Sequence, residues 1–152
     1  MFRRILVPLD GSSLAEGALG PALALAQGFN GEVALLRVVT PAELEYSGGL
    51  YALSRVWEQQ ERQTARAYLE DVRRRCCHGA AGTLLAVEMG PTPMSIIATA
   101  DRLHAGLIVM STHGRSGVNR LLYGSVAEAV VRAATVPVLL VPGRYQPPAP
   151  AD

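Results

Sequence analysis

Residues 106–141 decide the fold of this chain, and they read GLIVMSTHGRSGVNRLLYGSVAEAVVRAATVPVLLV. The stretch begins with a short apolar run over residues 106–110 and ends with another over residues 137–141, and a helical pattern over residues 124–135 lies between them. Short, continuous apolar runs are typical of strands that are buried on both faces. The stretch therefore predicts a strand, a glycine-rich loop, a helix and a second strand.

The same alternation fills the rest of the chain. Three more apolar runs predict strands and three more helical patterns follow them; the strands are expected at residues 3–9, 32–39 and 82–89, and the helices at residues 13–28, 54–77 and 92–104. Strict alternation favours a parallel sheet with helices on both faces, because right-handed crossovers place helices above and below it. We expect one doubly wound, Rossmann-like α/β domain with a five-stranded parallel sheet over residues 1–143, and a disordered proline-rich tail over residues 144–152.

Two of the expected helices carry further signals. Ser13 with Glu16 three residues later predicts a capping box at the start of the first helix, and Pro21 predicts a kink or irregular turn within it. Cys76 and Cys77 are adjacent at the end of the long helix, so we expect reduced structural thiols, with a vicinal redox pair as the alternative. The long helix has one stripe that we expect to cover a sheet face, formed by Ala65, Leu69, Val72 and Cys76.

Composition narrows the expected partners. The chain has 14 basic and 13 acidic residues, which gives a formal net charge of +1. Because it has neither a basic stripe nor an acidic block, we expect no nucleic acid and no membrane as a partner. Every basic residue is arginine, which excludes a Walker lysine and a Schiff-base lysine. With no secretion signal and no apolar run of about 18 residues, the sequence predicts a cytoplasmic protein.

The ligand site is expected at the carboxyl ends of the strands, where doubly wound sheets bind their ligands. Asp10 follows the first strand, and the loop over residues 111–126 follows the fourth. Ser125 begins the next helix, whose free N–H groups and dipole favour a phosphate. Three loop glycines allow positive φ and close backbone approach to an anion: Gly114, Gly117 and Gly124. The loop is therefore predicted to be a phosphate cradle.

Other interpretations of these residues stay open. Ser125 has Glu128 three residues later, so it is also compatible with a plain capping box. Asp10 suits either a metal or ribose contact, or a strand-end acid that accepts N–H groups from the following GSS segment. His113 suits either the orientation of a water molecule or a solvated loop position. Arg115 suits either a clamp on phosphate oxygens or a solubilising role.

The loop resembles the universal stress protein signature G-x2-G-x9-G-[ST], because Gly114 is followed after nine residues by Gly124 and Ser125. The resemblance extends over nearly the whole chain, apart from residues 40–80 and the tail. It is carried by the stretches RILVPLDGS, LLRVV, GPTPMSIIATA, LIVMSTHGRSG and GSVAEAVVRAATVPVLLVP. It implies the adenine nucleotide alpha hydrolase-like form of the Rossmann-like fold.

Resemblance to the nucleotide-binding branch of that family implies that ATP, which Mg²⁺ can accompany, lies across strands one, two and four. Pro8 and Asp10 match positions near the ribose and adenine, Val38 matches the strand-two position at the adenine, and Met110 precedes the loop. The phosphate contacts match Gly114, Gly124, Ser125 and Val126. Arg115 and Ser111 complete the candidate site, because both can donate hydrogen bonds to a phosphate.

Ser111 departs from the signature, which has glycine there. If the position needs a left-handed backbone, serine costs about 1–2 kcal/mol and weakens binding about tenfold or more. We therefore expect the serine to weaken ATP binding rather than to abolish it.

Three functions remain on the sequence alone. The first is a regulatory module that binds ATP through the loop and hydrolyses it slowly or not at all. The second is an enzyme that hydrolyses or uses ATP on the same fold, and the third is a nucleotide-free stress protein that binds partners by its surface. The last apolar strand, Val136–Val141, is expected at a sheet edge, where it would pair two copies into a homodimer.

Overall fold

The computed structural model describes residues 2–40, 51–77, 82–112 and 124–143, without the side chains of residues 51–54. It contains one five-stranded sheet in which every neighbouring pair of strands is parallel. The strand order is β3-β2-β1-β4-β5. The strands are β1 (Arg4–Leu9), β2 (Glu32–Val39), β3 (Leu84–Met89), β4 (Leu107–Thr112) and β5 (Val138–Pro142). The predicted five-stranded parallel sheet is confirmed.

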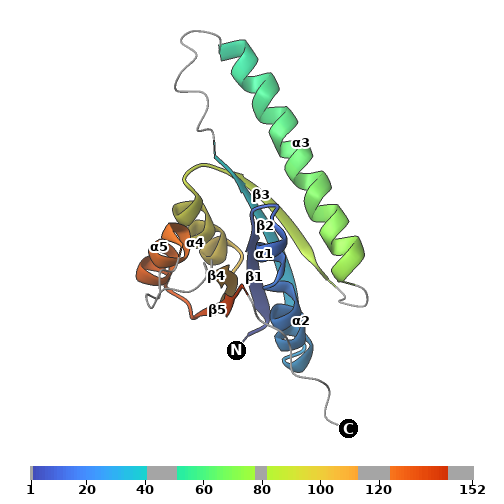
Figure 1. Cartoon of the computed structure of the whole chain (residues 1–152), viewed down its shortest axis with the longest axis vertical. Helices are drawn as coiled ribbons and strands as arrows, with labels where there is room; N and C mark the ends of the chain where they lie inside the picture. Colours follow the sequence, from blue (N-terminus) through green and yellow to red (C-terminus); the bar gives the residue numbers. More distant parts are fainter. Residues whose placement is uncertain (1, 41–50, 78–81, 113–123, 144–152) are drawn as a thin grey trace.

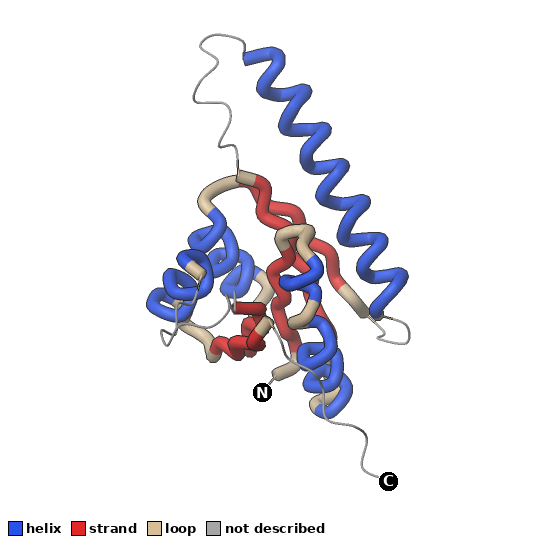
Figure 2. The backbone as a smooth tube through the Cα atoms, in the orientation of Figure 1, coloured by secondary structure: helices blue, strands red, loops and turns tan. Residues whose placement is uncertain are grey.

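Helices cover both faces of this sheet (Figure 1). They are α1 (Ser13–Glu16), α2 (Leu19–Gly28), α3 (Tyr51–Cys76), α4 (Thr92–Arg102) and α5 (Ser125–Ala133). The first three pack on one face and the last two on the other, as the backbone trace also shows (Figure 2). The doubly wound α/β fold expected from the alternation of strands and helices is therefore confirmed. The predicted tail, residues 144–152, lies outside the described residues.

Successive residues of β1 explain why the strands have continuous apolar sequences. Ile5 and Val7 lie in the core beneath α1, α2 and α3, whereas Leu6 lies in the core beneath α4 and α5. All three side chains are fully buried. Because both faces of the strand are covered at these positions, none of them favours a polar side chain.

The first helix starts at Ser13, as predicted, but its cap lies one residue earlier than expected and the helix is broken. Ser12, not Ser13, is the N-cap, and its side chain accepts a hydrogen bond from the Ala15 backbone N–H. The expected capping box is therefore wrong, and the Glu16 side chain instead contacts α3. The chain interrupts the helix between α1 and α2, so that Pro21 falls in the first turn of α2, where its missing N–H costs nothing.

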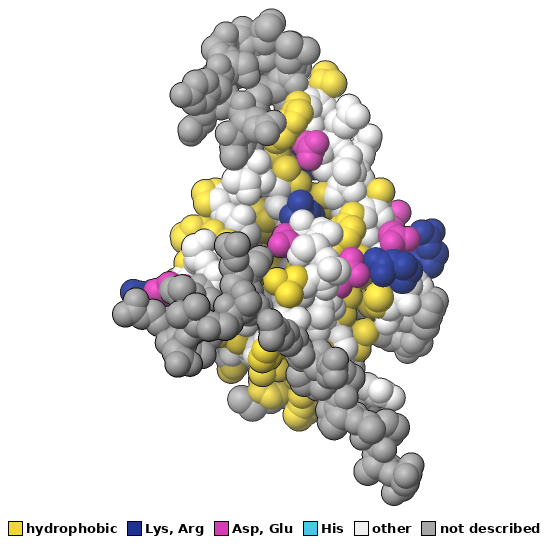
Figure 3. All heavy atoms as spheres, viewed as in Figure 1, with side chains coloured by type: hydrophobic (Ala, Val, Ile, Leu, Met, Phe, Trp, Pro, Cys, Tyr) yellow, Lys and Arg dark blue, Asp and Glu magenta, His cyan; other side chains and the backbone are white. Residues whose placement is uncertain are grey.

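The long helix α3 starts at Tyr51, three residues before the predicted start. Its predicted stripe is buried at Ala65, Leu69 and Val72, which face the sheet. Cys76 and Cys77 are both free thiols, and burial raises the pKa of the Cys77 thiol. Acidic and basic side chains lie side by side over the C-terminal part of α3 (Figure 3). Within the described part of the chain, no helix is long and apolar enough to cross a membrane.

Candidate functional site

A cavity of about 510 Å³ opens at the carboxyl ends of β1, β2 and β4. Its volume lies within the range of about 300–1,000 Å³ that is typical of small-molecule sites. The strand order reverses around β1, which pairs with β2 on one side and with β4 on the other. The cavity therefore occupies the switch point at which doubly wound sheets bind their ligands.

Most of the residues that the sequence singled out for the site line this one cavity. They are Pro8, Asp10, Val38, Met110, Ser111, Gly124, Ser125 and Val126. They come from three strands and one helix, and only the fold brings them together. Gly114 and Arg115 lie outside the described residues, as does the rest of the loop over residues 113–123.

Asp10 terminates β1 and organises the turn that follows it. One of its carboxylate oxygens accepts hydrogen bonds from the Ser12 backbone N–H at 2.8 Å and from the Ser12 hydroxyl at 2.6 Å. Gly11 between them has a φ of 91°, which only glycine adopts without strain. Desolvation by itself would raise the pKa of Asp10, but the Ser12 hydrogen bonds and the Arg37 charge outweigh it and lower the pKa. Asp10 thus has the strand-end role that was one of its two expected interpretations.

Gly124 and Ser125 place the N-terminus of α5 at the cavity. Gly124 is the N-cap, and no side chain caps the helix there. The capping box expected as an alternative is absent: Glu128 forms an ion pair with Arg132 at 2.7 Å instead. Gly124 has a φ of −53°, so it does not use the positive φ that a glycine allows. What remains at this end of the cavity is an array of backbone N–H groups suited to an anion.

Ser111 lies inside β4 and has an extended backbone. Only Asn30 and His104 among the described non-glycine residues have positive φ, so serine at position 111 pays no left-handed penalty. Its hydroxyl donates a hydrogen bond to the Val141 carbonyl oxygen at 3.3 Å. The side chain therefore ties β4 to β5, and donation by this hydroxyl to a phosphate stays a prediction.

Several residues that line the cavity were missed by sequence reasoning. Trp57 and Glu61 come from α3, Arg37 comes from β2, and Thr40 and Thr92 lie 3.2 Å apart between their hydroxyl oxygens. No sequence motif pointed to Trp57 as part of a ligand site. The spacing of Trp57 and Glu61, four residues apart on one helix, was the available signal, but it does not tell which sheet edge the helix approaches.

The described residues contain no group of three or more His, Cys, Asp or Glu side chains placed to hold a metal ion. Asp10 is the acid at the end of β1, and one of its oxygens is already engaged by Ser12. A magnesium ion that accompanied a nucleotide would take most of its ligands from phosphate and water.

Comparison with known protein families agrees with this geometry. A model of the universal stress protein family matches residues 1–142. The chain belongs to the universal stress protein family. Universal stress protein MJ0531 from Methanocaldococcus jannaschii is 31% identical over 146 residues, which cover 93% of this chain and 82% of that protein.

Solved structures of this family have the same fold. The structure of protein MJ0577 superposes with a TM-score of 0.78 at 25% identity and covers 96% of this chain and 99% of its own. The universal stress protein UspA from Lactobacillus plantarum has a TM-score of 0.73 at 23% identity and covers 92% of this chain and 97% of its own.

Proposed function

We propose that this universal stress protein is a regulatory module that binds an adenine nucleotide, ATP in the first instance, in the cavity at the switch point. The main support is that residues from three strands line one cavity together with the N-terminus of α5, which no side chain caps. Two structural neighbours at 22% identity were solved with adenine nucleotides, one with cAMP and one, from Archaeoglobus fulgidus, with dAMP. These neighbours share the fold, and they identify the ligand class to test first.

The energetics favour a ligand with both a phosphate and a base. A micromolar affinity corresponds to about 8 kcal/mol. The terminus of α5 contributes at most about 2 kcal/mol of this through its dipole. The remainder has to come from burial of the base against apolar side chains such as Val38 and Met110, together with further hydrogen bonds. A phosphate alone would therefore bind weakly.

Slow or absent hydrolysis is part of the proposal. Rapid hydrolysis needs a group that orients or deprotonates the attacking water. Asp10 is the acid of this cavity that follows β1, and its lowered pKa and its bonds to Ser12 make it a weak base. Bound nucleotide would then act by stabilising one arrangement of the protein rather than by being consumed.

The proposal is tested by calorimetric titration with ATP, in which the Ser125→Asp variant is compared with the wild type. An acid in the first turn of α5 stabilises the helix by about 0.3–1 kcal/mol, but it repels phosphate at the same place. We expect the ATP dissociation constant to rise at least about tenfold while the protein stays folded. Ala98→Asp, which adds the same charge at an exposed position of α4, should bind ATP as the wild type does.

Mass spectrometry of nucleotide released from the purified wild-type protein gives an independent measurement. Titrations with ATP, ADP, AMP and cAMP that show no heat, together with no released nucleotide, would overturn the proposal. In that case the nucleotide-free, partner-binding function would take its place.

The assembly belongs to the proposal too. We infer that two copies pair through the last strand, predicted at Val136–Val141 and found as β5. This strand is an edge of the sheet, and its Leu139 side chain is 38% exposed. An apolar edge strand with unpaired backbone groups favours pairing with a second copy.

A further inference from the structure

The cavity has a wall that comes from α3. Trp57 and Glu61 lie four residues apart on this helix and therefore on the same face of it. Both side chains are half-buried and line the cavity, whereas core positions of the same helix such as Leu69 are fully buried. An indole and a carboxylate are thus both available to a ligand in the cavity.

This wall lies at the end of the cavity opposite the anion-binding N-terminus of α5. The helix α3 packs over β2 and β3, whereas α5 packs over β4 and β5, so the two lie on opposite sides of β1. Because neighbouring strands are about 4.8 Å apart, β2 and β4 are separated by about 10 Å. A ligand with its phosphates at Ser125 therefore has its other end beneath α3.

The polar groups at this end have hydrogen-bonding capacity to spare. No hydrogen bond or ion pair joins the Glu61 side chain to any other described residue. Among the same residues, the Arg37 guanidinium donates one long hydrogen bond, to the Val38 carbonyl oxygen at 3.4 Å. The Arg62 guanidinium donates a hydrogen bond to the carbonyl oxygen of Val87, the register partner of Arg37, so that α3 contacts β3 at the level of Arg37.

We propose that α3 forms the base-recognising wall of the site, with Trp57 stacking on the purine ring and the Glu61 carboxylate accepting a hydrogen bond from its 6-amino group. This inference rests on the proposed nucleotide binding and adds the basis of its specificity. Aromatic side chains stack on any base, so Trp57 supplies affinity. The carboxylate accepts from an amino group and repels a keto oxygen, so Glu61 supplies the preference for adenine.

The single tryptophan of the chain makes the first measurement direct. Intrinsic fluorescence of the full-length protein is followed during titration with ATP, ITP and inorganic tripolyphosphate, and calorimetry is run in parallel. ITP differs from ATP in the base only, since it has a 6-keto group. We expect ATP to quench Trp57 emission, tripolyphosphate to leave it unchanged, and ITP to bind about tenfold more weakly than ATP.

Two variants separate the two roles. Trp57→Ala should weaken ATP binding about tenfold or more and leave tripolyphosphate binding unchanged. Glu61→Gln, in which an amide can donate to a keto oxygen, should bring the affinities for ITP and ATP within about threefold of each other. The matched controls are Val56→Ala and Glu70→Gln, which alter exposed positions of the same helix and should keep the wild-type affinities and preference.

The outcomes distinguish this inference from the function on which it rests. ATP binding by calorimetry without quenching, with unchanged affinity in Trp57→Ala, would overturn the role of α3 and leave nucleotide binding standing. Equal affinities of the wild type for ATP and ITP would overturn the role of Glu61. A lack of any heat with ATP would remove both the function and the inference.

Discussion

Ser111 shows how one side chain can replace a signature glycine without distorting the site. Its backbone continues β4, and its hydroxyl bonds to the carbonyl of Val141, its register partner in β5. The residue therefore contributes to the sheet, while its position at the cavity leaves backbone atoms near a ligand. Serine fits at this position because the strand does not require a left-handed conformation.

Replacing Ser111 by glycine should affect stability more than binding. Loss of the hydroxyl removes a hydrogen bond worth about 1 kcal/mol, and glycine inside a strand costs roughly 0.5–1 kcal/mol more. We expect urea unfolding to show a free energy about 1.5–2 kcal/mol lower, with ATP affinity changed less than about threefold. Ser111→Ala isolates the hydroxyl contribution, and tenfold tighter ATP binding by Ser111→Gly at unchanged stability would contradict this account.

The family resemblance was what placed Pro8, Val38 and Met110 in the site. In the structure all three line the cavity, near the carboxyl ends of neighbouring parallel strands. Trp57 gave no such signal, because its place above the cavity depends on how α3 crosses the sheet and not on its own neighbours in sequence. The loop residues Gly114 and Arg115 remain predictions.

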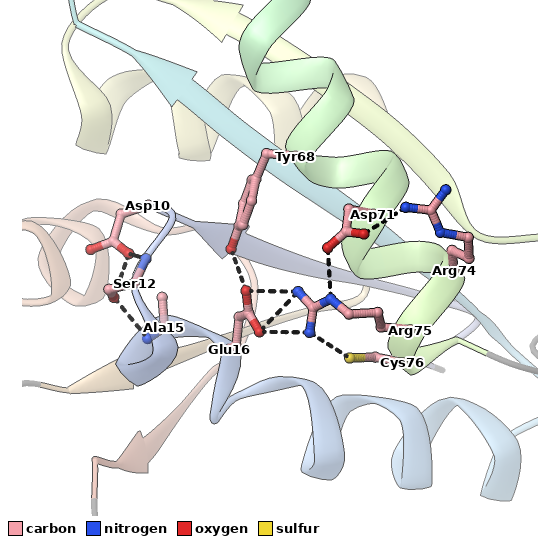
Figure 4. A network of polar contacts seen from close by, with 9 residues as sticks. All are labelled: Asp10, Ser12, Ala15, Glu16, Tyr68, Asp71, Arg74, Arg75 and Cys76. Atoms are coloured by element: carbon pink, nitrogen blue, oxygen red, sulfur yellow. Dashed lines mark hydrogen bonds and ion pairs between the residues drawn. The ribbon is translucent and has the colours of Figure 1, made fainter.

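At the scale of elements, one polar network joins α1 to α3 (Figure 4). The Tyr68 hydroxyl donates a hydrogen bond to Glu16 at 3.1 Å, and Arg75 pairs with the same carboxylate at 3.2 Å. Asp71 holds the Arg75 guanidinium from the other side at 2.7 Å. Since Ser12 caps α1 and Asp10 positions Ser12, the network connects the cavity to the helix α3.

The Tyr68 contact should make stability depend on alkaline pH. Burial, followed by the hydrogen bond to Glu16 and the charge of Glu16, raises the pKa of Tyr68 above its ordinary value of about 10. The folded state then holds the phenolic proton more tightly than the unfolded state, so this stabilisation is complete below about pH 10 and is lost as the pH rises further. We expect the free energy of unfolding of the wild type, measured with urea, to fall above that pH.

Tyr68→Phe is the control for this dependence. It should lower the free energy of unfolding by about 1 kcal/mol at neutral pH and show a smaller decline above about pH 10. Equal declines in the two proteins would show that other groups cause the alkaline loss.

Helix boundaries were the weak point of the sequence predictions, and α1 explains why. Ser12 and Ser13 are equivalent candidates for a cap, and the turn that Gly11 and Asp10 form selects the first. Glu16 matched the spacing of a capping box, but a distant partner, Arg75, determines its position. The existence and order of the elements follow from local patterns, whereas such pairings depend on contacts between segments far apart in the chain.

At the scale of the whole molecule, the exposed edge strand predicts a dimer that a single charge should dissociate. Leu139→Arg places a cation on the apolar surface of β5, where two copies would meet. Light scattering after size-exclusion chromatography of a dilution series should show a dimer for the wild type and a monomer for this variant. Met94→Arg, at an exposed position of α4, should remain dimeric. A wild-type protein that is monomeric at every concentration would reject pairing through β5.

Because β1 lies in the middle of the sheet, one of its two neighbouring strands is synthesised long after it. Strand β1 leaves the ribosome well before β4, yet Ile5 needs Leu107 of β4 as its neighbour. Translation at 5–20 residues per second delivers that partner roughly 5–20 s later. Until then β1 can pair only with β2, and its other side is an unprotected apolar edge. A nascent chain stalled before β4 should therefore be a substrate for chaperones.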